Sequence, residues 1–180
     1  MRASGILMPV FSLPGPYGIG TLGDEAFAFV DFLAAAKQTY WQILPIGPTG
    51  YGDSPYQSCS AFAGNPYFID LDLLAADGLL TQKDYANINW GSDAAKVDYS
   101  TLYEKRFAVL RKAYANFLKK RPVPGFETPY PDDWYRFQFL SSDWLPDYCL
   151  YMAIKEDNGM VDWQQWPRAL RVREPEALAA

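Results

Sequence analysis

The sequence contains no histidine and only two cysteines, and these shortages exclude several kinds of chemistry. Without an imidazole, these 180 residues alone cannot assemble a Ser-His-Asp triad or a histidine-ligated metal site. Cys59 and Cys149 lie far apart, and neither belongs to a Cys-x-x-Cys pair. We therefore predict reduced thiols in a cytoplasmic protein, with no zinc ribbon, no disulfide framework, no metal and no cofactor.

A basic surface and a long apolar run are also missing. Sixteen Lys and Arg residues stand against 21 Asp and Glu residues, which leaves a net charge of −5. This balance disfavours phosphate backbones and anionic lipids as partners. Prolines at 9, 14 and 16 interrupt the first apolar stretch before it reaches the length of a signal peptide or a membrane span. We expect no nucleic acid partner and no membrane partner.

Aromatic residues, in contrast, are abundant: they make up 17% of the chain, with 13 tyrosines and six tryptophans. Most of these rings are expected to fill the core, because each buries a large apolar area. The remaining rings need another role. An aromatic side chain with an apolar face and a polar edge suits a sugar, whose C–H faces pack on rings while its hydroxyls meet phenols and amides.

The first part of the chain has a β-α-β pattern. Residues Gly5 to Phe11 (GILMPVF) form a continuous apolar run, which is typical of a strand buried on both faces, with an irregularity at Pro9. Residues 23–37 have helical spacing, and Tyr40 to Ile46 form a second apolar run. Because β-α-β connections are almost always right-handed crossovers, the two strands are predicted to be parallel neighbours.

The rest of the chain is predicted to be a long connection followed by helices. Residues 47–65 are rich in Gly, Pro, Ser and Tyr and show no periodicity, which for a loop of this length favours a functional role. The predicted helices cover residues 71–80, 99–120, 132–140 and 145–157. Two strands followed only by helices cannot close a sheet. We therefore expect an α/β fold that is the amino-terminal part of a (β/α)₈ TIM barrel, with the remaining strands downstream.

A glycine-rich motif after the first strand suggests a second interpretation. Residues 18–23 (GIGTLG) match the G-x-G-x-x-G pattern of dinucleotide-binding folds. However, Pro14 and Pro16 separate these glycines from the first strand, and Tyr40-Trp41-Gln42 follow where an acidic residue is expected near the second strand. We interpret the motif as a wide turn.

The segment from Tyr51 to Ser58 (YGDSPYQS) carries the candidate site. In a barrel it would follow the second strand, at the carboxyl-terminal face where active sites lie. Pro55 restricts the backbone, the two tyrosines offer stacking faces, and the polar side chains offer hydrogen bonds to vicinal hydroxyls. An ordered structural loop explains the same residues equally well. The candidate residues in this segment are Tyr51, Asp53, Ser54, Tyr56 and Gln57.

Several long stretches resemble one known family. Residues 2–73, with RASGILMPVFSLPG, YGIGTLG, WQILPIGPTGYGDSPYQS and SAFAGNPYFIDLDLL, are similar to the amino-terminal region of amylomaltases, the 4-α-glucanotransferases of glycoside hydrolase family 77. A looser similarity extends through residues 97–99, 143–148 and 163–170. The resemblance implies a TIM barrel with a helix-rich insertion after the second strand. Residues 1–70 would form the first β-α-β unit and the substrate-binding loop, and residues 71–180 the helical insertion subdomain.

The resemblance also implies roles for the candidate residues. Tyr56 is similar to the aromatic residue that lines the subsite of bond cleavage, with Ser54 and Gln57 beside it. Tyr51 and Tyr99 resemble the tyrosines of an accessory glucan site. Asp53 belongs to the candidate substrate-binding set, although stabilisation of the turn is the better explanation of an aspartate at this position.

The implied reaction is the transfer of α-1,4-glucan segments between maltooligosaccharides with retention of configuration. This chemistry needs two carboxyl groups about 5 Å apart. In the family these groups come from later strands, so we expect no catalytic residue in this chain. The pairs Asp70 with Asp72 and Glu156 with Asp157 have unsuitable spacings and are interpreted as cap or surface residues.

Two other functions remain open at this stage. The first is a catalytically inactive glucan-binding fragment, because the tyrosines are retained while the acids are absent. The second is an aromatic-rich protein-interaction domain without a carbohydrate role.

Overall fold

The computed structural model describes residues 2–93, 95–120 and 132–179. The chain divides into two compact units, Met1–Pro129 and Tyr130–Ala180. The larger unit carries the strands and the candidate loop, and the smaller unit is helical.

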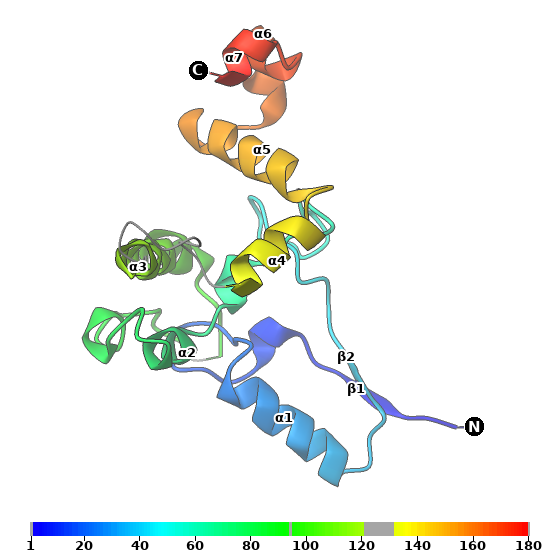
Figure 1. The fold of residues 1–180 in the computed structure, drawn as a ribbon. Coiled ribbons are helices and arrows are strands. Elements are labelled where there is room, and N and C mark those ends of the chain that lie inside the picture. Colours follow the sequence, from blue (N-terminus) through cyan, green and yellow to red (C-terminus); the bar gives the residue numbers. More distant parts are fainter. Residues whose placement is uncertain (1, 94, 121–131, 180) are drawn as a thin grey trace. The chain divides into compact units, whose positions relative to one another are not determined.

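The larger unit begins with the predicted β-α-β arrangement. Strand β1 (Gly5–Leu7), helix α1 (Asp24–Ala35) and strand β2 (Tyr40–Gln42) follow one another, with α1 beside the strand pair (Figure 1). The strands pair in parallel, with Gly5 opposite Tyr40 and Leu7 opposite Gln42. Within the described residues they form a two-stranded sheet. The prediction of adjacent parallel strands is therefore confirmed.

Both strands are shorter and more exposed than predicted. β1 ends at Leu7, and Val10–Ser12 form a short 3-10 helix preceded by Pro9 with φ −62° and ψ 144°. Proline has no amide hydrogen for the ladder, so pairing stops where the apolar run continues. β2 likewise ends at Gln42 instead of Ile46. The prediction of a first strand buried on both faces is wrong, because all its residues are exposed in the described unit.

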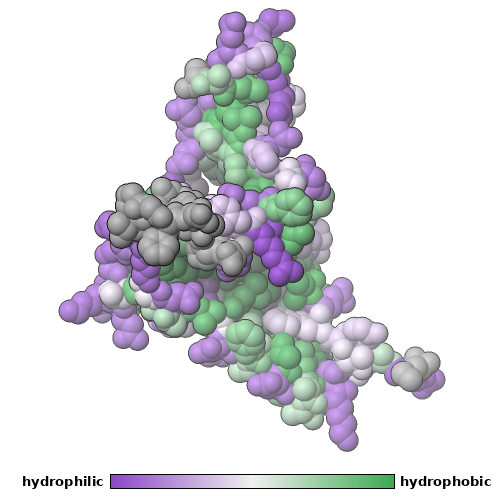
Figure 2. Space-filling model, viewed as in Figure 1, coloured by the Kyte–Doolittle hydropathy of each residue, from purple (hydrophilic) through white to green (hydrophobic). Residues whose placement is uncertain are grey.

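Helix α1 also presents apolar side chains at the surface. Phe27 and Phe32 are 63% and 61% exposed, while Ala26 and Leu33 are buried. Figure 2 shows hydrophobic side chains at the surface in the lower part of the view, where Figure 1 places α1. Together with the exposed Ile6 and Leu7 of β1, these side chains form uncovered apolar surface of a kind that normally packs against other elements.

The core of this unit lies where helices α2 (Leu71–Ala76) and α3 (Tyr99–Lys119) meet the segments after β1 and β2. α2 stops earlier than predicted, because Gly78 has φ +67° and the Leu79 amide donates back to the Leu74 carbonyl. Tyr114 of α3 is exposed. The buried α3 residues are Leu102, Arg106, Val109 and Ala113.

Asp70 and Asp72 hold several of these segments together. Asp70 caps α2 by accepting the Leu73 amide at 2.9 Å, and it accepts the Thr21 hydroxyl at 2.5 Å. A side chain at Gly23, the residue before α1, would overlap the Asp70 carboxylate. Asp72 accepts hydrogen bonds from the hydroxyls of Tyr17 and Tyr85 at 2.9 and 2.7 Å. Burial and the hydrogen bond to Asp72 raise the pKa of Tyr17 to about 12.

The smaller unit consists of helices and aromatic contacts. Its longer helices are α4 (Asp132–Leu140) and α5 (Leu145–Asp157), which have the predicted bounds. The 3-10 helix Trp163–Gln165 and the short helices α6 (Arg168–Arg171) and α7 (Pro175–Ala179) follow, although the sequence pattern predicted no element there. No helix in the described part of the chain combines the length and apolarity needed to cross a bilayer.

The stability of α3 is predicted to depend on pH. Asp98 caps the helix by accepting the Thr101 amide at 3.1 Å, and Asp84 forms an ion pair with Lys112. The backbone bond from Thr101 lowers the pKa of Asp98 to about 2, and the bond from Lys112 lowers that of Asp84 to about 2. Because both folded pKa values lie below 3.8, the stabilisation is complete above pH 3.8 and is lost as the pH falls towards 2.

The measurement is the free energy of unfolding as a function of pH. Asp98→Asn keeps a capping oxygen without the charge, so it is expected to flatten the acid dependence with little loss of stability at neutral pH. Asp98→Ala removes the cap and is expected to lower the free energy of unfolding at neutral and at acidic pH. An unchanged acid slope in Asp98→Asn would contradict the assignment.

Candidate functional site

The connection 47–65 is an ordered hairpin-like loop. An isolated antiparallel bridge pairs Thr49 with Ser58, and the tip between them contains consecutive β-turns. In the first turn the Asp53 amide donates to the Gly50 carbonyl at 3.1 Å, and in the second the Gln57 amide donates to the Ser54 carbonyl at 3.1 Å. The tip is therefore shaped by its own backbone bonds.

The first turn places Tyr51 at the end of the loop. Tyr51 and Gly52 occupy its two central positions, and Gly52 has φ +95°. A positive φ at the second central position is the requirement that favours glycine in a type II turn. Asp53 follows with φ +54°, a left-handed conformation that aspartate tolerates better than most residues. The Tyr51 side chain is fully exposed.

The second turn places Tyr56 beside Ser54. Pro55 occupies the first central position, where its fixed φ is already suited to the turn. The Ser54 hydroxyl accepts the Tyr56 amide at 3.3 Å, and the Tyr56 side chain is 72% exposed. Gln57 is exposed next to it. The Ser54 hydroxyl, the Tyr56 ring and the Gln57 amide therefore belong to one preformed turn.

The carboxyl-terminal end of the loop is fixed by Asn65. Its amide donates to the Ile46 carbonyl at 2.8 Å, which closes the loop at its base. Its side-chain oxygen accepts the Tyr67 amide at 3.0 Å and caps the 3-10 helix Pro66–Phe68. The loop therefore continues directly into the buried Tyr67 and Phe68 of the core.

Tyr99, the first residue of α3, lies beside Tyr67, which follows the loop. Its ring lies 6.1 Å from the ring of Tyr67 and is half-buried. Burial and the negative charge of Asp53 raise the pKa of Tyr99, and the same two causes are the largest that raise the pKa of Tyr67 to about 12. Burial also raises the pKa of Asp53. Asp53 therefore links the loop tip electrostatically to both phenols.

Tyr99 also lines a groove of about 950 Å³. The other walls come from the segment that follows β1, including Gly18 and Ile19, and from the segment before α3, including Trp90. Tyr51 and Tyr56 are not among the residues that line it. The structure thus brings the loop residues together on one hairpin and places Tyr99 in a neighbouring hollow.

Sequence reasoning missed Arg106, which is 0% exposed. Its guanidinium donates to the Tyr17 carbonyl at 3.2 Å and to the Ile69 carbonyl at 2.6 Å, and lies 5.9 Å from the centre of the Trp90 ring. Burial lowers its pKa to about 10. The signal was present, because Arg106 lies four residues after Leu102 on the buried stripe of α3.

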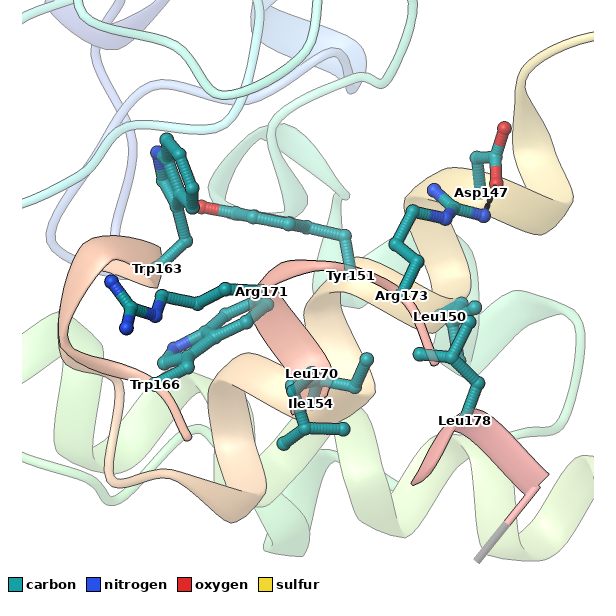
Figure 3. A pocket seen from close by; sticks show the side chains of 10 residues that line it. All are labelled: Asp147, Leu150, Tyr151, Ile154, Trp163, Trp166, Leu170, Arg171, Arg173 and Leu178. Carbon is teal, nitrogen blue, oxygen red and sulfur yellow. Dashed lines mark hydrogen bonds and ion pairs between the residues drawn. The ribbon is translucent and has the colours of Figure 1, made fainter. Parts of the chain in front are cut away.

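The smaller unit contains a separate pocket of about 260 Å³ that the sequence did not predict. In Figure 3 the Tyr151 side chain extends towards Trp163 above Trp166, and Leu150 meets Leu178 on the other side. The Arg173 guanidinium binds the Asp147 carboxylate at 2.7 Å (Figure 3). The walls are mainly apolar and aromatic, and this pocket contains none of the predicted site residues.

Asp70 and Asp72 have structural partners. Asp70 caps α2 and accepts the Thr21 hydroxyl, and Asp72 accepts the hydroxyls of Tyr17 and the buried Tyr85. Among the described residues no group of three or more His, Cys, Asp or Glu side chains could hold a metal ion. The expectation that the catalytic acids lie outside this chain stays a prediction.

Comparison with known proteins identifies the family. Residues 8–180 match the family model described as 4-alpha-glucanotransferase. The chain belongs to this family. The 4-alpha-glucanotransferases of Streptococcus pneumoniae TIGR4 and Clostridium butyricum are 49% and 46% identical over 178 and 173 residues. These alignments cover 98% and 95% of this chain but 34% and 33% of the relatives.

A solved structure supports the same assignment. The amylomaltase from Streptococcus agalactiae in complex with acarbose matches with a TM-score of 0.87 and 49% identity, over 99% of this chain and 35% of that chain. The predicted resemblance to 4-α-glucanotransferases and the α/β fold are confirmed. The chain spans about a third of the length of these relatives.

The first turn of the loop predicts a contrast between two glycines. Gly52→Ala forces a side chain into a left-handed conformation, at a cost of about 1–2 kcal/mol, so the Asp53 amide should lose roughly tenfold in hydrogen-exchange protection. Gly50→Ala is the control, because a Cβ there would lie 3.9 Å from the Gln57 carbonyl oxygen. Equal loss of protection in both variants would refute the role of the positive φ.

Proposed function

We propose that this chain supplies one wall of the glucan-binding cleft of a 4-α-glucanotransferase. The complete enzyme would transfer α-1,4-glucan segments between maltooligosaccharides or starch-type glucans with retention of configuration. The observation that carries the proposal is the exposed, preformed loop with Tyr51 and Tyr56, in a chain that belongs to this family. A solved relative that carries bound acarbose supports it.

Tyr56, Ser54 and Gln57 are proposed to contact the sugar where the glucan is cleaved. The Tyr56 ring offers a face to pyranose C–H groups, and the turn already holds its backbone, so little conformational entropy is lost on binding. The Ser54 hydroxyl accepts the Tyr56 amide and keeps its own proton for a sugar hydroxyl. The exposed Gln57 amide can both donate and accept.

Tyr51 and Tyr99 are proposed to form a second contact for longer glucans, and Asp53 belongs to the same set of candidate residues. Tyr51 projects from the loop tip and Tyr99 lines the neighbouring groove. Asp53 is half-buried, and its charge acts on Tyr67 and Tyr99. This setting supports a role for Asp53 in orienting the loop more than in direct contact with sugar.

The chemical step is proposed to use carboxyl groups from the remainder of a longer protein. A retaining mechanism needs a nucleophile and an acid/base about 5 Å apart. The contribution of this chain is to bind and orient the glucan, since its exposed rings and amides form no bond to the reacting carbon. No cofactor enters this scheme.

The proposed architecture is a TIM barrel with a helix-rich insertion after the second strand. Residues 1–70 would be its first β-α-β unit with the substrate-binding loop, and residues 71–180 the insertion subdomain. The exposed apolar side chains of β1 and α1 support this, because further barrel strands and helices would cover them. The free, exposed thiols of Cys59 and Cys149 are compatible with a cytoplasmic enzyme.

Glucan binding by this chain tests the proposal. Maltoheptaose is expected to bind, and Tyr56→Ala is expected to weaken binding about tenfold through loss of the stacking face. Tyr114→Ala, which removes an exposed tyrosine from α3, is the control and should leave the affinity unchanged. Isothermal titration calorimetry gives the dissociation constants. Absence of binding by the unsubstituted chain would favour an interaction domain without a carbohydrate role.

Transferase activity tests the division of labour. Incubation of the 180-residue chain with maltotriose is expected to yield no longer oligosaccharides, because the catalytic acids are proposed to lie outside it. Chromatography of the products is the measurement. Longer products would show that the chain itself contains a catalytic carboxyl pair.

A further inference from the structure

We propose that Arg106 is the positioning residue that holds Tyr99 and its groove in place relative to the loop 47–65. The inference rests on the proposed function for its consequence in glucan binding. Its structural part can be measured independently of any sugar. The hydrogen bonds and the ring contact of Arg106 within the described residues go to Tyr17, Ile69 and Trp90, so it would act through the segments that it joins.

The first connection runs from Arg106 to the loop. The guanidinium donates to the Ile69 carbonyl at 2.6 Å, just after the 3-10 helix Pro66–Phe68. That 3-10 helix is capped by Asn65, the residue that closes the base of the loop. A short stretch of ordered backbone therefore separates the Arg106 contact from the loop.

The second connection runs along α3 to Tyr99. Arg106 lies seven positions after Tyr99, so both are on the same face of the helix. Tyr99 packs 6.1 Å from Tyr67, and Arg106 binds Ile69, which follows Tyr67 by two residues. The helix and the segment 66–69 are thus joined at two successive points. Rotation or sliding of α3 would break both contacts.

The third connection fixes the groove. Arg106 donates to the Tyr17 carbonyl at 3.2 Å, and the next residue, Gly18, lines the groove. It also lies against the ring of Trp90, which lines the groove from the segment before α3. One side chain therefore contacts both of the other segments that line the groove with Tyr99.

Arginine suits this position better than another buried side chain. Its planar fork can donate to separate carbonyls in fixed directions while its face packs on an indole ring. Its Nε–H is buried and has no hydrogen-bond partner among the described residues. A buried unpaired donor costs stability, so the side chain is not optimised for stability alone. The guanidinium fork of Arg106 fixes the positions of the segments that it joins.

Spin-label distances test the structural part. Labels on the native Cys59 in the loop and on Glu104→Cys of α3, with Cys149→Ser, report the separation of loop and helix. The distance distribution is expected to be narrow. Arg106→Lys keeps the charge but lacks the fork, so it should broaden the distribution. Lys119→Arg, which exchanges the same two residue types at an exposed position of α3, is the matched control and should leave it unchanged. An unchanged distribution in Arg106→Lys overturns the proposal.

Glucan affinity tests the functional part. Arg106→Lys is expected to weaken maltoheptaose binding about tenfold, the effect of one lost hydrogen bond to a charged group, and to leave maltotriose binding unchanged. General damage to the fold would weaken both sugars, and this result would refute a positioning role. If the unsubstituted chain binds neither sugar, the proposed function fails, and the label distances alone decide the role of Arg106.

A second variant covers the case in which Arg106→Lys does not fold by far-ultraviolet circular dichroism. Trp90→Phe reduces the ring that faces the guanidinium and keeps both hydrogen bonds of Arg106. It is expected to broaden the label distribution and to weaken maltoheptaose binding more than maltotriose binding. A narrow distribution in this variant would overturn the proposal.

Discussion

The buried guanidinium of Arg106 is the constraint on which the arrangement of the larger unit depends. A charge removed from water must be solvated by the protein, and here carbonyl oxygens of Tyr17 and Ile69 and the ring of Trp90 replace water. The charge of Asp70 opposes the fall in its pKa, which still reaches about 10, so the group remains charged at neutral pH. Segments distant in sequence must converge around it.

The base of the larger unit and the tip of the candidate loop are held by different polar contacts. Asp70 caps α2 and binds Thr21, and Asp72 binds Tyr17 and the buried Tyr85, while the loop tip is shaped by its own turns. The result is a loop held by backbone hydrogen bonds, with exposed rings at Tyr51 and Tyr56. The proposed glucan-binding role suits this preformed shape, because little conformational entropy of the loop would be lost on binding. Membership in the 4-α-glucanotransferase family supports that proposal.

The sequence by itself determined much of the local structure. The spacing of apolar residues predicted α3 and α5 to within a residue at each end, because helical periodicity and capping are local properties. The β-α-β order predicted the parallel pair, because a crossover connection joins parallel strands. Strand length was overestimated, since apolar runs do not reveal where a ladder lacks a partner or where Pro9 ends it. The glycine and proline of the loop marked its turns.

Only the tertiary structure decided which of these elements meet. Arg106 is buried and Tyr114 is exposed on the same helix, whereas their residue types favour the opposite arrangement. The charge of Asp53 raises the pKa of Tyr99, a residue of a separate element, and the ring contact of Tyr67 with Tyr99 depends on how α3 packs. The sequence determined the turns and helices because their interactions span a few residues. Packing over long sequence separations decided the site, because each such contact depends on the placement of all its neighbours.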